Sequence, residues 1–389
     1  MLEKALVGDR RYWGWICFLL AVMGVGLIFY LRQFSFGLGI TGMSRDVSWG
    51  LYISQFTFLV GIAASGVMVV LPYYLHDYKA FGKITILGEF LAIPAVIMCM
   101  LFIFIDMGQP TRVLNVLLHP SPSSVMFFDM VVLAGYLVLN ILVGWTTLHA
   151  EKKGIAPASW VKPLIILSIA WAPSIHTVTA FLYAGLPGRH FWLSAIMAAR
   201  FLASAFASGP ALLILLALIV RKFSKFDPGK EAIQALGRIV TYFMLTNVFF
   251  LGLEFFTAFY SKIPGHMMSF EYLYMGLEGH GKLVPLMWAS SILSVLAIGL
   301  LVFPQIRKNE TLLAIASVTV FVALWIDKGF GLVVGGFVPN PFERITEYWP
   351  TIPEASIALG VWAFGFLLLT ILYKIAVTVK EESGGEAIH

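Results

Sequence analysis

The sequence predicts an all-α, polytopic membrane protein with ten transmembrane helices. Three observations lead to this prediction. The 389 residues are 59% hydrophobic and only 12% charged, and the mean hydropathy is +0.88. A soluble domain has about a quarter charged residues, so we expect lipid to cover much of this chain. Ten apolar stretches reach the length of about 20 residues that a bilayer requires, and short polar segments join them.

The ten spans follow one another along the whole chain, at residues 12–33, 49–76, 84–106, 124–148, 162–185, 196–220, 236–261, 283–305, 311–336 and 354–378. Lipid offers no partners to backbone N–H and C=O groups, so each span is expected to be a helix that satisfies them internally. The connections are rich in Gly, Pro and charge, as in HDYKAFGK (76–83). The two cysteines, Cys17 and Cys99, lie inside apolar runs and are expected to be buried thiols.

An internal similarity predicts two related halves. FLVGIAASG (58–66) and FLASAFASG (201–209) match at five of nine positions. The span after each segment carries an acid in its outer part, Asp106 in the first half and Glu254 in the second. Chance is the alternative, because small residues recur wherever helices approach closely. We predict a first flanking helix and outer loop (1–48), two parallel four-helix bundles (49–185 and 196–336), and a last flanking helix with a cytoplasmic tail (337–389).

The distribution of basic residues predicts the orientation. Of the 26 lysines and arginines, 17 fall on one side of the predicted spans and 8 on the other, and Lys328 lies within a span. Basic residues accumulate on the cytoplasmic side, so we expect an inner-membrane protein with both termini cytoplasmic. The outer loops (107–123, 186–195, 262–282 and 337–353) are poor in charge but hold Pro, Trp, Phe and His. They either pack at the membrane interface or form a docking surface for a partner outside.

Ionisable residues within the spans are the main functional signal, because a charge at mid-bilayer costs about 2.5–3.5 kcal/mol on insertion scales. Seven fall in the outer half and only Glu89 falls in the inner half. Each one alone could be a helix cap, an ion pair or a satisfied core histidine. Together they favour a polar pocket that opens toward the outer side. The set is Glu89, Asp106, Asp129, His176, Arg200, Glu254, Asp327 and Lys328.

The residue types favour a quinone as the ligand of this pocket. Only His176 lies well inside a span, so a transmembrane bis-histidine haem is not expected, and without cysteine pairs or clusters neither c-type haem nor iron–sulfur clusters are expected. No metal site and no Gly-rich phosphate loop is predicted. A quinone needs hydrogen-bond donors for two carbonyls in an apolar slot, and its reduction takes up two protons. Buried histidine and carboxyl groups supply both needs.

Five segments in order resemble the NrfD/polysulfide-reductase family of membrane subunits. They are RDVSWGLYISQFTFLVGIAASG (45–66), IDMGQP (105–110), SIHTVTAF (174–181), AARFLASAFASG (198–209) and LEFFTAFYS (253–261). The resemblance covers nearly the whole chain. The ten-helix form is most similar to the membrane subunits of the Dsr and Hmc electron-transfer complexes of sulfate reducers.

The resemblance implies a menaquinone-interacting subunit of a multi-subunit oxidoreductase in sulfur-type anaerobic respiration, without haem or iron–sulfur groups of its own. Its implied partners are an extracytoplasmic ferredoxin-like iron–sulfur subunit, a multihaem cytochrome c, further membrane or cytoplasmic subunits and lipids, and no nucleic acid. Glu254, His176 and Asp106 are implied near the quinone or on a proton route. The predicted pocket further includes Arg45, Trp49, Asp129, Asp327 and Lys328.

Two other functions stay open on the sequence. A proton-coupled solute transporter also uses helix repeats and acids near the midplane, but it predicts polar groups on both sides of the bilayer. A purely structural anchor would not need the acids. For Glu254 itself, the alternative to a proton role is a structural ion pair.

Overall fold

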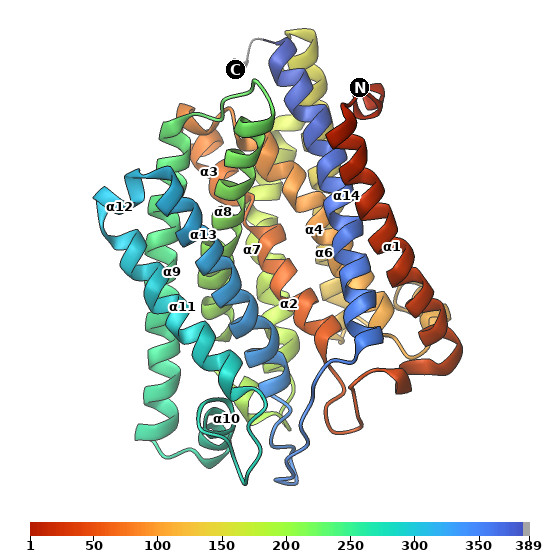
Figure 1. Cartoon of the computed structure of the whole chain (residues 1–389), viewed down its shortest axis with the longest axis vertical. Helices are drawn as coiled ribbons and strands as arrows, with labels where there is room; N and C mark the ends of the chain where they lie inside the picture. The colour runs from red at the N-terminus through yellow and green to blue at the C-terminus, as the bar shows by residue number, and fades with distance from the viewer. Residues whose placement is uncertain (384–389) are drawn as a thin grey trace.

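The computed structural model describes residues 1–383, and these fold into a bundle of long helices (Figure 1). Within this range ten helices are long and apolar enough to cross a membrane. The prediction of an all-α protein with ten spans is confirmed. The chain is therefore a polytopic integral membrane protein.

The spans agree closely with the predicted ranges. In chain order they are α1 (Arg10–Phe36), α2 and α3 (Leu51–Ala64 and Val67–His76), α4 (Thr85–Asp106), α6 (Val125–Lys153), α7 (Val161–Ala184), α8 (Met197–Phe223), α9 (Lys230–Tyr260), α11 (Val284–Val302), α13 (Glu310–Trp325) with the π-helical segment η6 (Ile326–Val334), and α14 (Ile352–Glu382). The connections contain the short helices α5 (Asn115–Leu118), α10 (Pro264–Tyr274) and α12 (Pro304–Lys308).

We expected the second span to be one continuous helix, but the structure divides it into two. A turn at Ser65 and Gly66 separates α2 from α3. There the backbone approaches α4 closely, since a Cβ built on Gly66 would lie 3.0 Å from the carbonyl oxygen of Gly88. The Ser65 hydroxyl donates to the carbonyl of Ile62 at 2.6 Å. Glycine at this crossing permits the close approach, and the interruption leaves irregular backbone inside the bundle.

The helices pack in a repeated pattern. In the first half α2 packs on α4, α4 on α6, α6 on α7 and α7 on α2, and in the second half α8, α9, α11 and α13 pack in the same order. These contacts support the proposal of two four-helix units, whose boundaries remain a prediction. The flanking helices α1 and α14 pack against each other, and α14 also lies on α4 (Figure 1).

The two similar segments meet at the contact between α2 and α8. A Cβ built on Gly209 would lie 1.9 Å from the Cβ of Ser65, and one built on Gly61 would lie 3.3 Å from the Cβ of Ala205. Small residues therefore bring these two helices into backbone contact, as in other membrane bundles. The segments that match in sequence thus form the junction between the halves.

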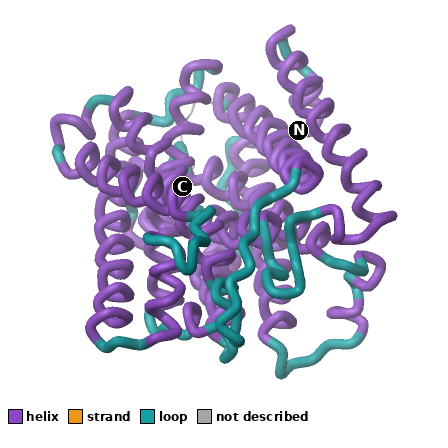
Figure 2. Tube along the Cα trace, turned by 60° about the horizontal axis from the view of Figure 1, so that its bottom comes forward, coloured by secondary structure: helices purple, strands orange, loops and turns teal. Residues whose placement is uncertain are grey.

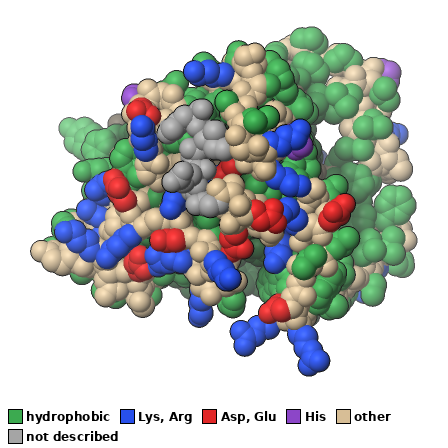
Figure 3. All heavy atoms as spheres, turned by 90° about the horizontal axis from the view of Figure 1, so that it is seen from above, with side chains coloured by type: hydrophobic (Ala, Val, Ile, Leu, Met, Phe, Trp, Pro, Cys, Tyr) green, Lys and Arg blue, Asp and Glu red, His purple; other side chains and the backbone are tan. Residues whose placement is uncertain are grey.

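The two ends of the bundle differ. Lys4 near the N-terminus forms an ion pair with Glu382 at the end of α14, so both ends of the described chain lie together (Figure 1). We call this end the termini end. Lys, Arg, Asp and Glu side chains gather on it (Figure 3). Long loops cover the opposite end, which we call the outer end (Figure 2).

The two cysteines lie in different environments. Cys99 is buried in α4, as predicted, but Cys17 is exposed on α1. The prediction for Cys17 was wrong because α1 lies at the edge of the bundle, where only 17% of its apolar window is buried. An apolar run shows that a helix enters lipid, but it does not show which helices are peripheral.

Candidate functional site

The most charged site lies in the outer half, between α8, α9 and η6. The Nη2 atom of Arg200 donates to both carboxylate oxygens of Asp327, at 2.8 and 3.0 Å, and Nη1 pairs with Glu254. Arg200 and Asp327 are only 3% and 6% exposed. Buried charges of this kind are tolerated when each finds an opposite partner. The structure thus brings together two predicted site residues, Glu254 and Asp327, through Arg200.

Lys328 and His176 lie beside this ion pair and leave polar atoms without partners. The ammonium nitrogen of Lys328 has no hydrogen-bond partner and lies 4.9 Å from the ring centre of Phe201, a cation–π distance. Nε2 of His176 lies 2.7 Å from the carbonyl oxygen of Phe201. A carbonyl only accepts, so Nε2 carries the proton and Nδ1 of the neutral ring is a free acceptor. We call His176, Arg200, Glu254, Asp327 and Lys328 the Arg200 cluster.

The π-helical segment η6 positions the charges of this cluster. A π-helix places its hydrogen bonds from residue i to i+5 and widens the turn, and such segments are frequent at functional sites. Two glycines let this widened turn fit its neighbours. Gly329 faces Ser54 of α2, and a Cβ on Gly331 would come within 2.8 Å of the sulfur of Met287. Asp327 and Lys328, adjacent in sequence, both become buried here.

Asp106 lies apart from the Arg200 cluster, at the outer end of α4 beside α1. Gln33 of α1 donates to the carbonyl of Ile105 at 2.6 Å and accepts from the Tyr52 hydroxyl at 2.7 Å. Asp106 Oδ1 and the hydroxyl of Tyr30 are buried and have no partner. Both lie close enough to Tyr52 to act on it electrostatically. We call Tyr30, Gln33, Tyr52 and Asp106 the Asp106 group.

Asp129 and Tyr183 lie between these two sets. Asp129 accepts a hydrogen bond of 2.6 Å from Thr179, and Tyr183 pairs with Thr57. Asp129 and Asp106 both act electrostatically on Tyr183. The ring of Tyr183 lies 5.9 Å from that of Phe201, which contacts His176 and Lys328. Polar groups therefore recur across the outer half from α4 to α9.

The remaining predicted pocket residues, Trp49 and Arg45, differ in burial. Trp49 is half-buried, stacks on Trp192 at 5.8 Å between ring centres and meets the ring of Tyr183 edge-on at 5.6 Å. Arg45 is exposed. Its neighbour Asp46 accepts from Thr346 at 2.9 Å and from Asn340 at 3.1 Å, and these hydrogen bonds hold the pKa of Asp46 below its usual range. Asp46 thereby joins the loop before α2 to the loop before α14.

Sequence reasoning missed Glu354, a fully buried carboxylate at the start of α14. It accepts from the backbone N–H groups of Gly42 and Leu51, at 2.9 and 3.2 Å, and from the hydroxyl of Tyr348. With Thr351 it also forms a capping box. The pattern Thr351–Ile–Pro–Glu354 is the sequence signal for such a cap, and it could have identified the residue.

The arrangement supports proton and hydrogen-bond chemistry. Among residues 1–383 no group of three or more His, Cys, Asp or Glu side chains could hold a metal ion. Unpartnered buried atoms lie at both sets: Tyr30 hydroxyl and Asp106 Oδ1 in one, Lys328 Nζ and His176 Nδ1 in the other. Native proteins leave few buried polar atoms without partners. Each of these atoms is therefore available to a ligand, a water molecule or a proton.

Comparison with known proteins identifies the family. The profile of the family described as "Polysulphide reductase, NrfD" matches residues 39–338. The chain belongs to the NrfD family. The matched region extends from the loop before α2 to the end of the second half and includes both candidate sites except Tyr30 and Gln33.

Relatives with names match this member of the NrfD family over nearly its full length. It is 25% identical to a protein of Halobacterium salinarum that is named as a dimethyl sulfoxide reductase membrane subunit (92% of this chain, 89% of the relative). It is 23% identical to a selenate reductase subunit of Mesobacillus selenatarsenatis (94% and 94%). It is 20% identical to the Hdr-like menaquinol oxidoreductase integral membrane subunit of Archaeoglobus fulgidus (99% and 98%).

Proposed function

We propose that this protein is the quinone-interacting membrane subunit of a multi-subunit respiratory oxidoreductase. It exchanges electrons between menaquinone and an iron–sulfur subunit docked on the outer end. The names of the relatives support this proposal, because one belongs to a menaquinol oxidoreductase and two belong to reductases. The predicted orientation, with both termini cytoplasmic, makes the outer end extracytoplasmic.

The observation that carries the proposal is the pair of unpartnered polar atoms in the Asp106 group. A quinone head needs a donor for its carbonyl, and a quinol needs an acceptor for its hydroxyl. The Tyr30 hydroxyl can donate and the Asp106 carboxylate can accept, and neither has a partner in the structure. Both side chains are partly exposed; Tyr30 belongs to the peripheral helix α1, and Asp106 lies beside that helix. A ligand that arrives through the lipid can therefore reach them.

The chemistry assigned to these residues balances. Oxidation of a quinol releases two electrons and two protons. The electrons pass to the iron–sulfur partner. No residue of this chain is assigned as an electron acceptor. Asp106 takes one proton from a quinol hydroxyl, and the second proton leaves from the other hydroxyl to water, while Tyr30 and Gln33 orient the ring. Reduction of a quinone runs through the same contacts in reverse.

The Arg200 cluster supports a second part of the proposal, a proton relay. Glu254 is 10% exposed, whereas its partner Arg200 is almost fully buried, so the carboxylate lies at the edge of the cluster. His176 Nδ1 is a free acceptor within the cluster. Protons released near Asp106 would pass along the hydroxyl and carboxyl groups of Tyr183 and Asp129 toward these residues.

Exposed apolar side chains support the docking of a partner on the outer end. Phe342, Ile352 and Met275 are 83%, 77% and 76% exposed, and they lie in or next to the outer loops. Exposed apolar surface of this kind marks interaction sites with protein or membrane. A photo-crosslinking residue at position 342 should therefore capture an iron–sulfur subunit. A fusion reporter after residue 389 that is active only outside the cytoplasm would contradict the orientation.

The central test uses Tyr30→Phe and Asp106→Asn in the assembled complex, with Tyr12→Phe as the control. Tyr12 lies on the same helix near the termini end, where its hydroxyl donates to Ala5. A lost hydrogen bond costs about 0.5–1.5 kcal/mol, so Tyr30→Phe should raise the KM for a soluble menaquinol analogue a few-fold. Asp106→Asn should lower kcat strongly. Wild-type kinetics in both variants would leave a structural anchor as the better explanation.

The proton relay needs its own test. Glu254→Gln keeps shape and hydrogen bonding but removes the exchangeable proton, and Asp327→Asn serves as a matched variant of the other Arg200 partner. We expect Glu254→Gln to lower the rate of quinone turnover and to alter its pH profile more than Asp327→Asn does, because Glu254 lies at the edge of the cluster. An assembled Glu254→Gln complex with the wild-type rate at every pH would make the ion pair structural.

A further inference from the structure

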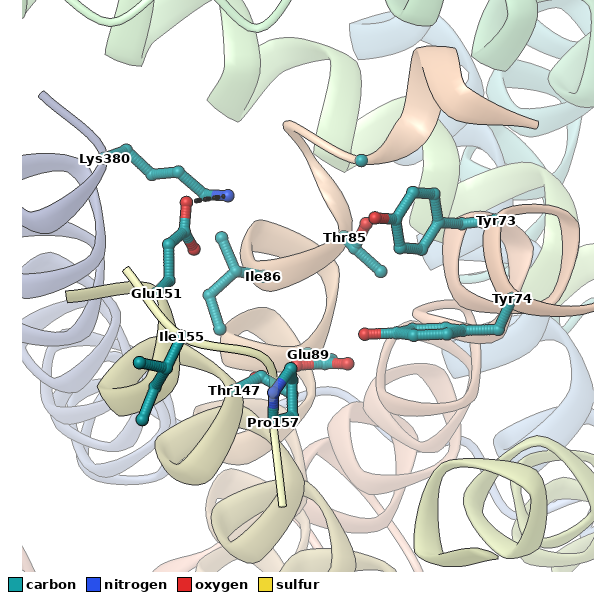
Figure 4. A pocket seen from close by; sticks show the side chains of 11 residues that line it. Tyr73, Tyr74, Thr85, Ile86, Glu89, Thr147, Glu151, Ile155, Pro157 and Lys380 are labelled. Atoms are coloured by element: carbon teal, nitrogen blue, oxygen red, sulfur yellow. Dashed lines mark ion pairs between the residues drawn. The ribbon is translucent and has the colours of Figure 1, made fainter. Parts of the chain in front are cut away.

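Two small cavities meet at Glu89 in the first half of the bundle. The first, of about 50 Å³, opens near the termini end, where Glu151 of α6 and Lys380 of α14 line it (Figure 4). The second, of about 10 Å³, lies among Gly66, Tyr136, Asn140 and Ser168. Glu89 lines both cavities, and it is the residue that they share. A water molecule needs about 10–15 Å³ of such space, so the first cavity has room for a few waters and the second for one.

Two further observations point to Glu89. Its Oε1 atom is buried without a hydrogen-bond partner, and the residue is only 4% exposed. The interruption between α2 and α3 lies directly beside it, since Gly66 and Val67 line the second cavity. In membrane proteins, irregular backbone at membrane depth is tolerated where it lines a cavity. Discontinuous helices often form ion sites.

We propose that Glu89 is a proton-exchange site supplied with water from the termini end of the bundle. A hydronium ion in the first cavity gives its proton to the carboxylate, which leaves one water and one neutral carboxyl group. The carboxyl then gives the proton to the water of the second cavity. This exchange requires no electron transfer, so it stands apart from the proposed quinone function.

The groups around Glu89 fit a proton better than another ligand. The cavities are too small for an organic solute. A metal ion would need several anionic ligands, and within residues 1–383 no cluster of three His, Cys, Asp or Glu side chains exists. An unpaired buried carboxylate is costly, so such a group takes up a proton readily. Tyr74 extends its ring toward Glu89 from α3 (Figure 4).

The mouth of the first cavity carries an ion pair. Lys380 Nζ lies 2.5 Å from Glu151 Oε1, on the side of the cavity away from Tyr73 and Tyr74 (Figure 4). The charged groups that face Glu89 are therefore Lys380 of α14 and Glu151 of α6. Their pairing keeps the entrance polar and close to neutral, which admits water without attracting one sign of ion.

Infrared difference spectroscopy of the complex in lipid tests the proposal, with D2O as the probe. A protonated carboxyl gives a separate C=O band that shifts when its proton exchanges for deuterium. We expect a band that shifts on rapid mixing with D2O and that Glu89→Gln removes. Thr147 lines the first cavity, so Thr147→Leu should fill space there. It should leave the band in place and slow its shift by about tenfold, because exchange then requires a local opening.

Thr246→Leu is the matched control, since Thr246 lies at the surface of α9, away from both cavities. It should exchange as fast as the wild type. Thr85→Leu repeats the cavity filling from α4 if Thr147→Leu does not assemble. The proposal is wrong if Glu89→Gln leaves the spectrum unchanged, or if the variants that fill the first cavity, Thr147→Leu and Thr85→Leu, exchange at the wild-type rate.

Discussion

The two halves of the bundle place their most buried ion pairs at opposite ends, Glu151 with Lys380 at the termini end and Arg200 with its two carboxylates toward the outer end. One residue before the matched segments, the first half has Thr57 and the second has Arg200. Thr57 pairs with the hydroxyl of Tyr183, whereas Arg200 holds two buried carboxylates. At the termini end the first half instead has the cavities at Glu89. In the second half, Arg307 packs on Gly237 there and donates to the carbonyl of Leu301.

This difference shows how two similar sets of helices can divide functions between them. The contact between α2 and α8 needs small residues from both halves, and both matched segments contain them. Polar residues that do not contribute to this contact can differ between the halves. The first half has two cavities at Glu89, the larger of which lies near the termini end, and the second half has the buried ion pairs of Arg200 toward the outer end.

Removal of Arg200 should have the largest effect on this comparison. Arg200→Met leaves the buried Glu254 and Asp327 without the cation that hydrogen-bonds to both of them, which costs about 3–5 kcal/mol. We expect poor assembly and a much lower Tm in detergent. The triple variant with Glu254→Gln and Asp327→Asn should recover a large part of the loss. If Arg200→Met alone were as stable as the wild type, the side chains of the cluster would be hydrated and would interact only weakly with one another.

Substitution of Glu354 should have the next-largest effect on stability, because Glu354 hydrogen-bonds to a helix of the first half only. It accepts from the N–H of Leu51 at the start of α2, whereas α8 begins without a side-chain cap. Glu354→Ala leaves several buried donors unsatisfied and should cost about 1–3 kcal/mol. Thermal unfolding would be compared with Glu381→Ala, an exposed residue on the same helix. Equal Tm values for the two variants would contradict this role.

Thr57 should matter less than Arg200, although it occupies the matching position. Thr57→Val removes one hydrogen bond to Tyr183 and keeps the shape of the side chain, for a cost of about 1 kcal/mol. Thr246→Val, at the surface of α9, is the control for loss of a threonine hydroxyl. If Thr57→Val lowered the Tm as much as Arg200→Met, the two matching positions would contribute equally to stability, which would contradict this comparison.

Asp46 should give the smallest effect, and it should depend on pH. Hydrogen bonds from Thr346 and Asn340 lower its pKa. The contact therefore contributes stability above the unfolded pKa of about 3.9, and this contribution is lost as the pH falls through the lower folded pKa. The protection factors of residues 340–346 against hydrogen exchange, relative to the intrinsic rates at each pH, should fall in acid. Asp46→Asn should flatten that pH dependence, and unchanged acid behaviour in the variant would contradict the assignment.

The sequence predicted the number of spans well because a bilayer requires about 20 apolar residues for each. It misjudged helix ends where polar turns continue beyond the lipid. α9 begins at Lys230 rather than near 236, and α14 continues to Glu382. Hydropathy detects the lipid-facing part of a helix, but the backbone hydrogen bonds continue past it.

The candidate site was only partly predictable, because its pairs join helices far apart in the chain. Arg200 and Glu254 stood out as intramembrane charges, yet no local pattern shows that they meet with Asp327. The position of Asp106 beside α1 depends on α14 holding α1 in place. The turn at Ser65 and Gly66 had a weak signal, a Ser–Gly pair inside an apolar run, and the π-helical turn had two glycines, Gly329 and Gly331.

The pairing of α1 with α14 has a consequence for biosynthesis. Their backbones touch at Gly26 and Gly360, where a Cβ on Gly26 would lie 2.7 Å from the Cα of Gly360. Of the long helices in residues 1–383, the one made first thus finds its main partner in the one made last. At about 5–20 residues per second, α1 waits roughly 15 s to 1 min in the membrane before α14 is made. During that time α1 lacks the helix that holds it in place, so Tyr30 and Gln33 are not yet fixed beside Asp106.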